Sequence, residues 1–219
     1  MTDYSEEEQV ERLRKWWEEN GTAVVLAVVL SVGGLLGWRY WQGQQQQQAE
    51  GASVVYEQMM ESVQQWQAMP DNTTLAEQIR ASADSLVTEF GNTAYADYAR
   101  FVLARLAVEQ GEYGEASTWL RDAMDSPASD AIGWTARARL ARVQLESGEL
   151  EQAASTLNAS WPASWQGQAF ELRGDLARKQ GDVEAARAAY QSALDALPED
   201  GSGFRELVQM KLDDLAPAS

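Results

Sequence analysis

One long apolar run interrupts the polar N-terminal part of the chain. Residues 21–38 read GTAVVLAVVLSVGGLLGW and contain no charged side chain. As an α-helix this run spans about 27 Å, and extension to Trp41 gives about 31 Å, enough to cross the hydrocarbon core of a bilayer. Because no other part of the chain is apolar enough to surround such a helix, the pattern predicts a transmembrane helix over 21–41 rather than a buried core helix.

The flanks of this run suit a membrane anchor that is not cleaved. A secretory signal peptide has a basic start and small residues at its cleavage site, whereas residues 1–20 are acidic and bulky side chains follow the run. Large amphipathic rings stand at both ends, where they fit the headgroup regions. These predicted interface anchors are Trp16, Trp17, Trp38, Tyr40 and Trp41.

The basic residues near the span predict its orientation. Arg12, Arg14 and Lys15 precede it, while Arg39 alone lies within twenty residues after it. Lys and Arg are retained on the cytoplasmic side. We therefore expect a cytoplasmic N-terminus and, in a bacterial inner membrane, a periplasmic C-terminal part.

Small residues recur along the predicted span at helical spacing. Small side chains let two membrane helices approach closely. They are also common in any membrane helix, so contact with a second helix is only one of two interpretations. The candidate helix-packing face consists of Ala23, Ala27, Ser31, Gly33 and Gly37.

The segment after the span keeps a helical pattern. Five glutamines, residues 44–48, could form a flexible linker or begin a helix. Apolar residues then recur at intervals of three and four from Ala52 to Trp66, and the pattern ends before Pro70. We interpret residues 42–70 as a linker or stalk helix.

A repeat is visible in the remaining chain. Gly111, Gly148 and Gly181 lie 37 and 33 residues apart, each between two amphipathic segments. Each glycine is followed by an apolar residue two positions later, an alanine five positions later and a larger apolar residue four further on. These residues are Tyr113, Leu150 and Val183, then Ala116, Ala153 and Ala186, and finally Leu120, Leu157 and Tyr190.

This spacing is typical of tetratricopeptide repeats. The glycine ends one helix in a left-handed conformation, the first apolar residue plugs the turn, and the alanine admits the neighbouring helix. With no period-2 pattern to indicate strands, we predict an all-α fold in which the transmembrane helix precedes a helical-repeat solenoid. The solenoid occupies 71–219, or begins near 45 if the stalk supplies its first helix, and 202–215 caps it.

Composition narrows the function. The chain carries 34 acidic and 17 basic residues, a formal charge of −17, and no histidine or cysteine. This charge argues against nucleic acid as a partner. The missing residue types exclude disulfides, thiol nucleophiles and imidazole or thiolate metal ligands. No nucleotide-binding loop or nucleophile elbow is present either, so we expect a non-enzymatic protein without a metal or other cofactor.

The concave face of the predicted solenoid is the candidate binding site. Such a face is lined mainly by the first helix of each repeat, and exposed aromatic residues there would suit apolar segments of partner proteins. Arg105 and Arg142 occupy the same repeat position and form either a basic spot or ion pairs with nearby carboxylates. The candidate partner-binding residues are Tyr98, Phe101, Arg105, Thr135, Ala138, Arg142, Glu171, Asp175 and Arg178.

The whole arrangement resembles the YfgM family, ancillary subunits of the bacterial SecYEG translocon. The resemblance rests on an acidic tail, one N-terminal span ending Gly37-Trp38-Arg39-Tyr40-Trp41, and a tetratricopeptide-like domain. It continues through Leu140-Ala-Arg-Val-Gln144, Leu172-Arg-Gly-Asp-Leu176 and Met210-Lys-Leu-Asp-Asp-Leu215, so it covers nearly the full chain.

The resemblance implies an inner-membrane scaffold that links protein translocation to periplasmic chaperones. Its implied partners are the SecYEG translocon, a membrane-anchored periplasmic chaperone of the prolyl-isomerase type and secreted client proteins. The alternative is a membrane-tethered signalling protein whose cytoplasmic tail, residues 1–20, sequesters a stress-response regulator.

Overall fold

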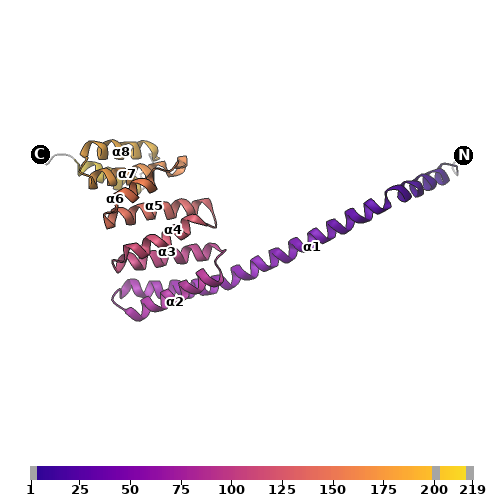
Figure 1. Cartoon of the computed structure of the whole chain (residues 1–219), viewed down its shortest axis with the longest axis horizontal. Coiled ribbons are helices and arrows are strands. Elements are labelled where there is room, and N and C mark those ends of the chain that lie inside the picture. Colours follow the sequence, from indigo (N-terminus) through magenta and orange to yellow (C-terminus); the bar gives the residue numbers. More distant parts are fainter. Residues whose placement is uncertain (1–3, 199–202, 216–219) are drawn as a thin grey trace. The chain divides into compact units, whose positions relative to one another are not determined.

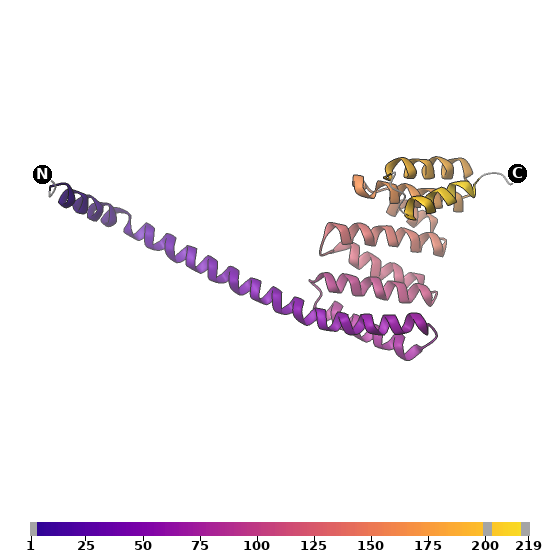
Figure 2. The ribbon, with the colours of Figure 1, turned by 180° about the vertical axis from the view of Figure 1, so that it is seen from behind.

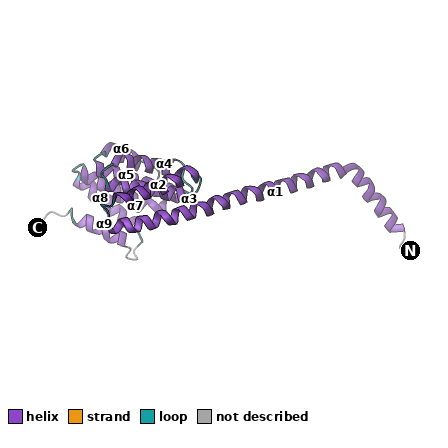
Figure 3. Ribbon diagram, turned by 90° about the horizontal axis from the view of Figure 1, so that it is seen from below, coloured by secondary structure: helices purple, strands orange, loops and turns teal. Residues whose placement is uncertain are grey.

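The computed structural model describes residues 4–198 and 203–215. Within these ranges the chain is helical and contains no strand, which confirms the predicted all-α fold (Figure 3). The helices are α1 (Tyr4–Ala68), α2 (Thr73–Glu89), α3 (Ala94–Glu109), α4 (Tyr113–Asp125), α5 (Asp130–Ser147), α6 (Leu150–Leu157), a 3-10 turn (Ala163–Trp165), α7 (Gln166–Lys179), α8 (Val183–Ala196) and α9 (Gly203–Asp213).

The chain divides into two compact units, Met1–Glu50 and Gly51–Ser219. Parts of three sequence predictions lie outside the described residues: positions 1–3 of the acidic tail, position 202 of the cap, and positions 199–202 and 216–219 of the repeat domain.

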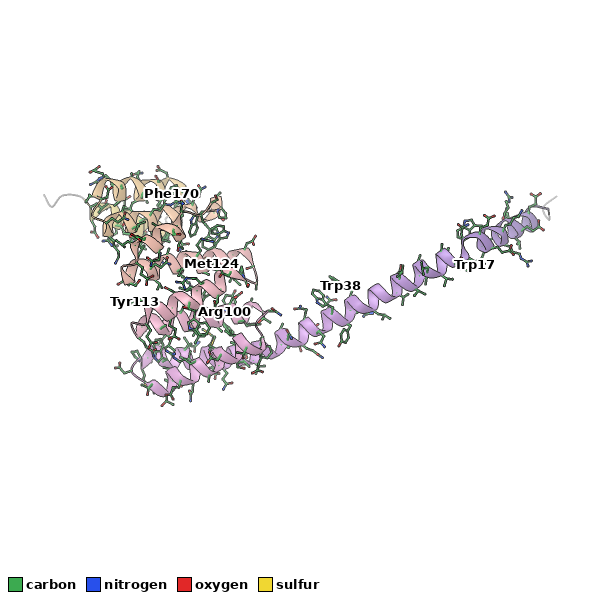
Figure 4. All side chains as sticks on the ribbon, in the orientation of Figure 1. Trp17, Trp38, Arg100, Tyr113, Met124 and Phe170 are labelled. Atoms are coloured by element: carbon green, nitrogen blue, oxygen red, sulfur yellow. The ribbon has the colours of Figure 1, made fainter. Side chains whose placement is uncertain are left out.

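The first unit consists of the N-terminal part of α1. Among the described residues, α1 is the one helix long and apolar enough to cross a membrane, by length and composition. Its apolar side chains face outward: Leu26 and Leu36 are each 62% exposed. The rings at Trp17 and Trp38 also project from the helix (Figure 4). Such a surface is what a helix surrounded by lipid requires.

The second unit is a stack of antiparallel helices (Figure 1). Its first core cluster joins Met59 and Val63 of α1 to Ile79 and Leu86 of α2. Three further clusters follow along the stack, and Val208 of α9 belongs to the last of them. Helix α9 packs against α8, and Lys211 of α9 also reaches α7 (Figure 2). This arrangement confirms the helical-repeat solenoid, and the cap predicted over 202–215 falls on α9.

The repeat glycines adopt the conformation that their spacing predicts. The φ angles of Gly111, Gly148 and Gly181 are 76°, 82° and 83°. The alanines five positions later are fully buried, as are Leu120, Leu157 and Tyr190 to within 2%. One expectation is wrong: Val183 is 44% exposed and does not plug its turn, whereas Tyr113 and Leu150 at the matching positions pack against core clusters.

Replacing Gly148 with alanine is expected to lower the free energy of unfolding by about 1 kcal/mol, because a side chain is strained at this positive φ. Nothing lies within 4 Å of the added Cβ, so the cost would come from the backbone alone. The free energy is measured by urea titration of the full chain. Gly148→Asn is the control, since asparagine tolerates the left-handed region and should cost less. Equal losses for both variants would contradict this explanation.

Candidate functional site

An apolar pocket of about 480 Å³ lies between α3, α4 and α5. Its floor consists of buried side chains, among them Phe101 and Ala104 of α3 and Val143 of α5. Tyr113, labelled in Figure 4, adds a ring where α4 begins. Three arginines complete the wall, namely Arg105, Arg139 and Arg142.

Helical spacing explains why α5 contributes so many residues to this wall. Counted from Arg139, the other wall residues of α5 lie three, four and seven positions later, which places all four on one face of the helix. They are Arg142, Val143 and Glu146. Residues on other faces of α5 pack in the core instead. Ala138, for example, is 1% exposed and belongs to the next core cluster.

A second pocket of about 210 Å³ adjoins the first. The two pockets share Phe101, Arg105 and Arg139, and the second also involves Met60 and Trp66 of α1. Together we call them the arginine-rimmed groove. The groove thus offers two apolar depressions with two arginines at the boundary between them.

The two shared arginines lie against aromatic rings. The guanidinium carbon of Arg139 is 4.5 Å from the centre of the Phe101 ring, and that of Arg105 is 5.9 Å from the Trp66 ring. Ring faces attract cations, so these contacts orient the charges over the groove. Partial burial lowers the pKa of Arg139, and the neighbouring charge of Arg142 lowers it further. Among the described residues, no carboxylate lies within 4 Å of either shared guanidinium.

An ion cluster adjoins the groove on the C-terminal side. Glu171 is fully buried; one of its oxygens accepts from Arg142 at 3.2 Å and the other from Lys211 of α9 at 2.5 Å. Lys211 also donates to Asp175 at 2.6 Å, and the Tyr190 hydroxyl donates to Asp175 at 2.7 Å. Burial, followed by this hydrogen bond, raises the pKa of Tyr190. The cluster therefore joins the groove to the capping helix.

A row of aromatic rings leads to the groove from the other side. The rings of Tyr56 and Tyr98 are 6.0 Å apart, and those of Tyr98 and Phe101 are 6.5 Å apart. Burial and the neighbouring tyrosines raise the pKa of Tyr56. Tyr98 is 43% exposed, so the row offers an accessible apolar surface beside the pockets.

The structure separates the predicted groove residues into three groups. Phe101, Arg105 and Arg142 meet in the arginine-rimmed groove, and Tyr98 adjoins it through Phe101. Glu171 and Asp175 belong to the ion cluster instead. The remaining three lie elsewhere. Thr135 donates its hydroxyl to the carbonyl of Ala131, and Arg178 is exposed in the last turn of α7. Ala138 packs in a core cluster.

Three of these predictions need correction. Ala138 is 1% exposed and packs in the core, because it lies on a different face of α5 from the groove residues. Phe101 is only 7% exposed, because it forms the floor of the groove beneath Arg139 rather than an exposed aromatic surface. Glu171 is fully buried and faces two cations of this chain, so it is not accessible to a partner. Of the two interpretations of the paired arginines, Arg142 follows the ion-pair one and Arg105 the basic-spot one.

Sequence reasoning missed Arg139 and Lys211. Arg139 stands three positions before Arg142, and this spacing is the signal that places both on one face of α5. The prediction chose Ala138, one position away, which faces the core instead. Lys211 had no local signal, because its carboxylate partners are 36 and 40 positions away in the chain.

The side chains predicted to anchor the span at the membrane interfaces lie on the outer surface of α1. The interface anchors are between 49% and 72% exposed, with the rings of Trp38 and Trp41 5.3 Å apart. On the candidate helix-packing face, the Ser31 hydroxyl donates to the carbonyl of Ala27, and nothing lies within 4 Å of a Cβ added at Gly33 or Gly37.

The repeat glycines and paired helices define a tetratricopeptide-like protein. The family model described as a tetratricopeptide repeat-like domain matches residues 14–217. Three similar proteins, each named ancillary SecYEG translocon subunit, come from Haemophilus influenzae, Aggregatibacter actinomycetemcomitans and Escherichia coli K12. They are 32%, 30% and 30% identical, over 96–97% of this chain and 97% of each relative. The chain belongs to this family of ancillary SecYEG translocon subunits.

Proposed function

We propose that the protein is a non-enzymatic inner-membrane scaffold that associates with the SecYEG translocon. In this proposal residues 21–41 span the membrane, the N-terminus lies in the cytoplasm and the solenoid lies in the periplasm. The solenoid binds protein partners there and connects polypeptides leaving the translocon with periplasmic chaperones.

The arginine-rimmed groove is the observation that carries this proposal. An accessible apolar depression with aromatic anchors and arginines has the composition of a protein-binding hot spot. The relatives are named ancillary SecYEG translocon subunits, and these names support association with the translocon. Arg12, Arg14 and Lys15 before the apolar run support the orientation.

The charge distribution agrees with a periplasmic domain held near a bilayer. The chain after Trp41 contains 27 acidic and 13 basic residues. Anionic lipid headgroups repel such a surface. The domain would thus depend on its helix to stay at the membrane, and its groove would remain available to protein partners.

A photo-crosslinking residue at Arg105 is expected to yield adducts with translocon subunits, a periplasmic chaperone or exported polypeptides in intact cells. Arg105 lines both pockets and is exposed. The same residue at Arg121, exposed on α4 away from both pockets, is the control. Adducts are identified by mass spectrometry. If neither position yields any of these three kinds of adduct, or if both yield them equally, the proposed use of the groove is wrong.

A further inference from the structure

We propose that the arginine-rimmed groove selects acidic apolar polypeptide segments, in which large apolar side chains flank one or two carboxylates. This inference rests on the proposed function and names the class of polypeptide that the scaffold takes. It excludes segments whose polar residues are Lys or Arg.

The shape of the groove supplies the apolar part of this pattern. Two depressions of about 480 and 210 Å³ adjoin, and each can take a large side chain. Phe101 forms part of both floors, so the depressions are continuous along α3. A polypeptide with two apolar side chains fills such a pair of sites, whereas a single compact ligand fills only one.

The charges supply the acidic part. Arg105 and Arg139 stand at the boundary of the two depressions, over aromatic rings. Within the described residues they have no carboxylate partner at ion-pair distance, whereas Arg142 is held by Glu171. A carboxylate placed between the two apolar side chains would meet both guanidinium groups, and arginine binds carboxylates through paired hydrogen bonds.

Nearby acidic residues do not cancel this positive site. Glu146 lines the larger pocket, but Lys179 lies 3.7 Å from it. Glu112 and Glu115 pair with Arg80 of α2. The groove is therefore a local positive site on an acidic domain, and this contrast would steer carboxylates to it.

The experiment measures binding of a synthetic peptide to the full chain in phosphatidylcholine nanodiscs. The probe is a ten-residue peptide with Leu-Glu-Glu-Phe at its centre and a neutral dye, read by fluorescence anisotropy with empty nanodiscs subtracted. We expect at least a tenfold higher dissociation constant when both glutamates are replaced by glutamine, and no saturable binding when they are replaced by lysine.

Substitutions in the protein provide the second arm. Arg139→Gln and Arg105→Gln are each expected to weaken binding of the acidic peptide about tenfold and to leave the weak binding of the glutamine peptide unchanged. Arg121→Gln, at an exposed arginine outside the groove, should change neither. Circular dichroism and thermal unfolding identify any variant that has lost its fold, and the peptide series on the unaltered chain gives a result independent of the variants.

Three outcomes overturn the inference. The first is equal binding of the acidic and glutamine peptides. The second is that the two groove variants bind the peptides as Arg121→Gln does. The third is binding of dodecanoate at the groove without binding of the acidic peptide. The last outcome would identify a site for small anionic amphiphiles. Failure of the peptide series together with crosslinks from Arg105 would leave the scaffold standing. Charge-dependent peptide binding without any such crosslink would refute the proposed function but would leave the selectivity for acidic peptides standing.

Discussion

Replacing Gly174 with alanine is expected to lower the free energy of unfolding by about 2 kcal/mol. A Cβ built at Gly174 would lie 2.3 Å from Cε1 of Tyr190 and 2.4 Å from its Cδ1. Tyr190 is fully buried and its hydroxyl is held by Asp175, so the ring has no free space to enter. The helices α7 and α8 would have to separate. Thermal unfolding of the full chain should show a midpoint lower by roughly 4–8 °C.

The same substitution at Gly114 provides a matched control. Gly114 is in α4 and nothing lies within 4 Å of an added Cβ, so helix propensity alone should act there. Gly114→Ala is expected to raise stability by about 0.5 kcal/mol. In the Gly174→Ala background, Tyr190→Leu should cost less than it does alone, because it removes the ring edge that clashes. Additive costs would contradict the packing explanation.

Replacing Lys211 with methionine is expected to lower the free energy of unfolding by about 3 kcal/mol, because one member of a largely buried ion cluster is lost. The Lys211 side chain is 20% exposed and those of Glu171 and Asp175 are 1% and 13% exposed, so water cannot readily replace the ammonium group. The Arg142 pair remains, but it contacts only one oxygen of Glu171. Urea titration of the full chain measures the loss.

Lys179 is the matched control for this second variant. It also pairs with a glutamate, Glu146, but the distance is 3.7 Å and the two side chains are 36% and 63% exposed. Lys179→Met should change the free energy of unfolding by about 0.5 kcal/mol or less. Adding Glu171→Gln to Lys211→Met should recover part of the loss. Similar losses at positions 179 and 211 would show that burial does not determine the strength of this cluster.

The repeat fold could be predicted because its determinants are local in sequence. Each repeat glycine must adopt a positive φ, and each alanine five positions later must fit against a neighbouring helix. These requirements recur at intervals of 37 and 33 residues, and three repetitions in register identify the architecture. The repeat pattern does not predict the exposure of Val183, since Tyr113 and Leu150 at the matching positions pack against core clusters and Val183 does not.

The groove was harder to predict because it depends on how each helix is rotated. Phe101, Arg105 and Arg142 were identified, but a one-position error on α5 excluded Arg139. A rotation of that size exchanges a side chain that faces the core for one that faces the groove. The ion cluster depends on Lys211, which the fold brings to Glu171 across 40 positions, and helical periodicity says nothing about contacts at that separation.

The distance in sequence between Lys211 and Glu171 has a consequence for the timing of assembly. Most helices in the stack contact those next to them in the chain, so the preceding repeats can form in the order in which they are synthesised. Glu171 is an exception, since one of its cations arrives only with α9. Until then, the last helix pair carries a carboxylate that lacks one of its partners. The arrival of α9 therefore acts as a completion step, after which the terminal repeat acquires its full stability.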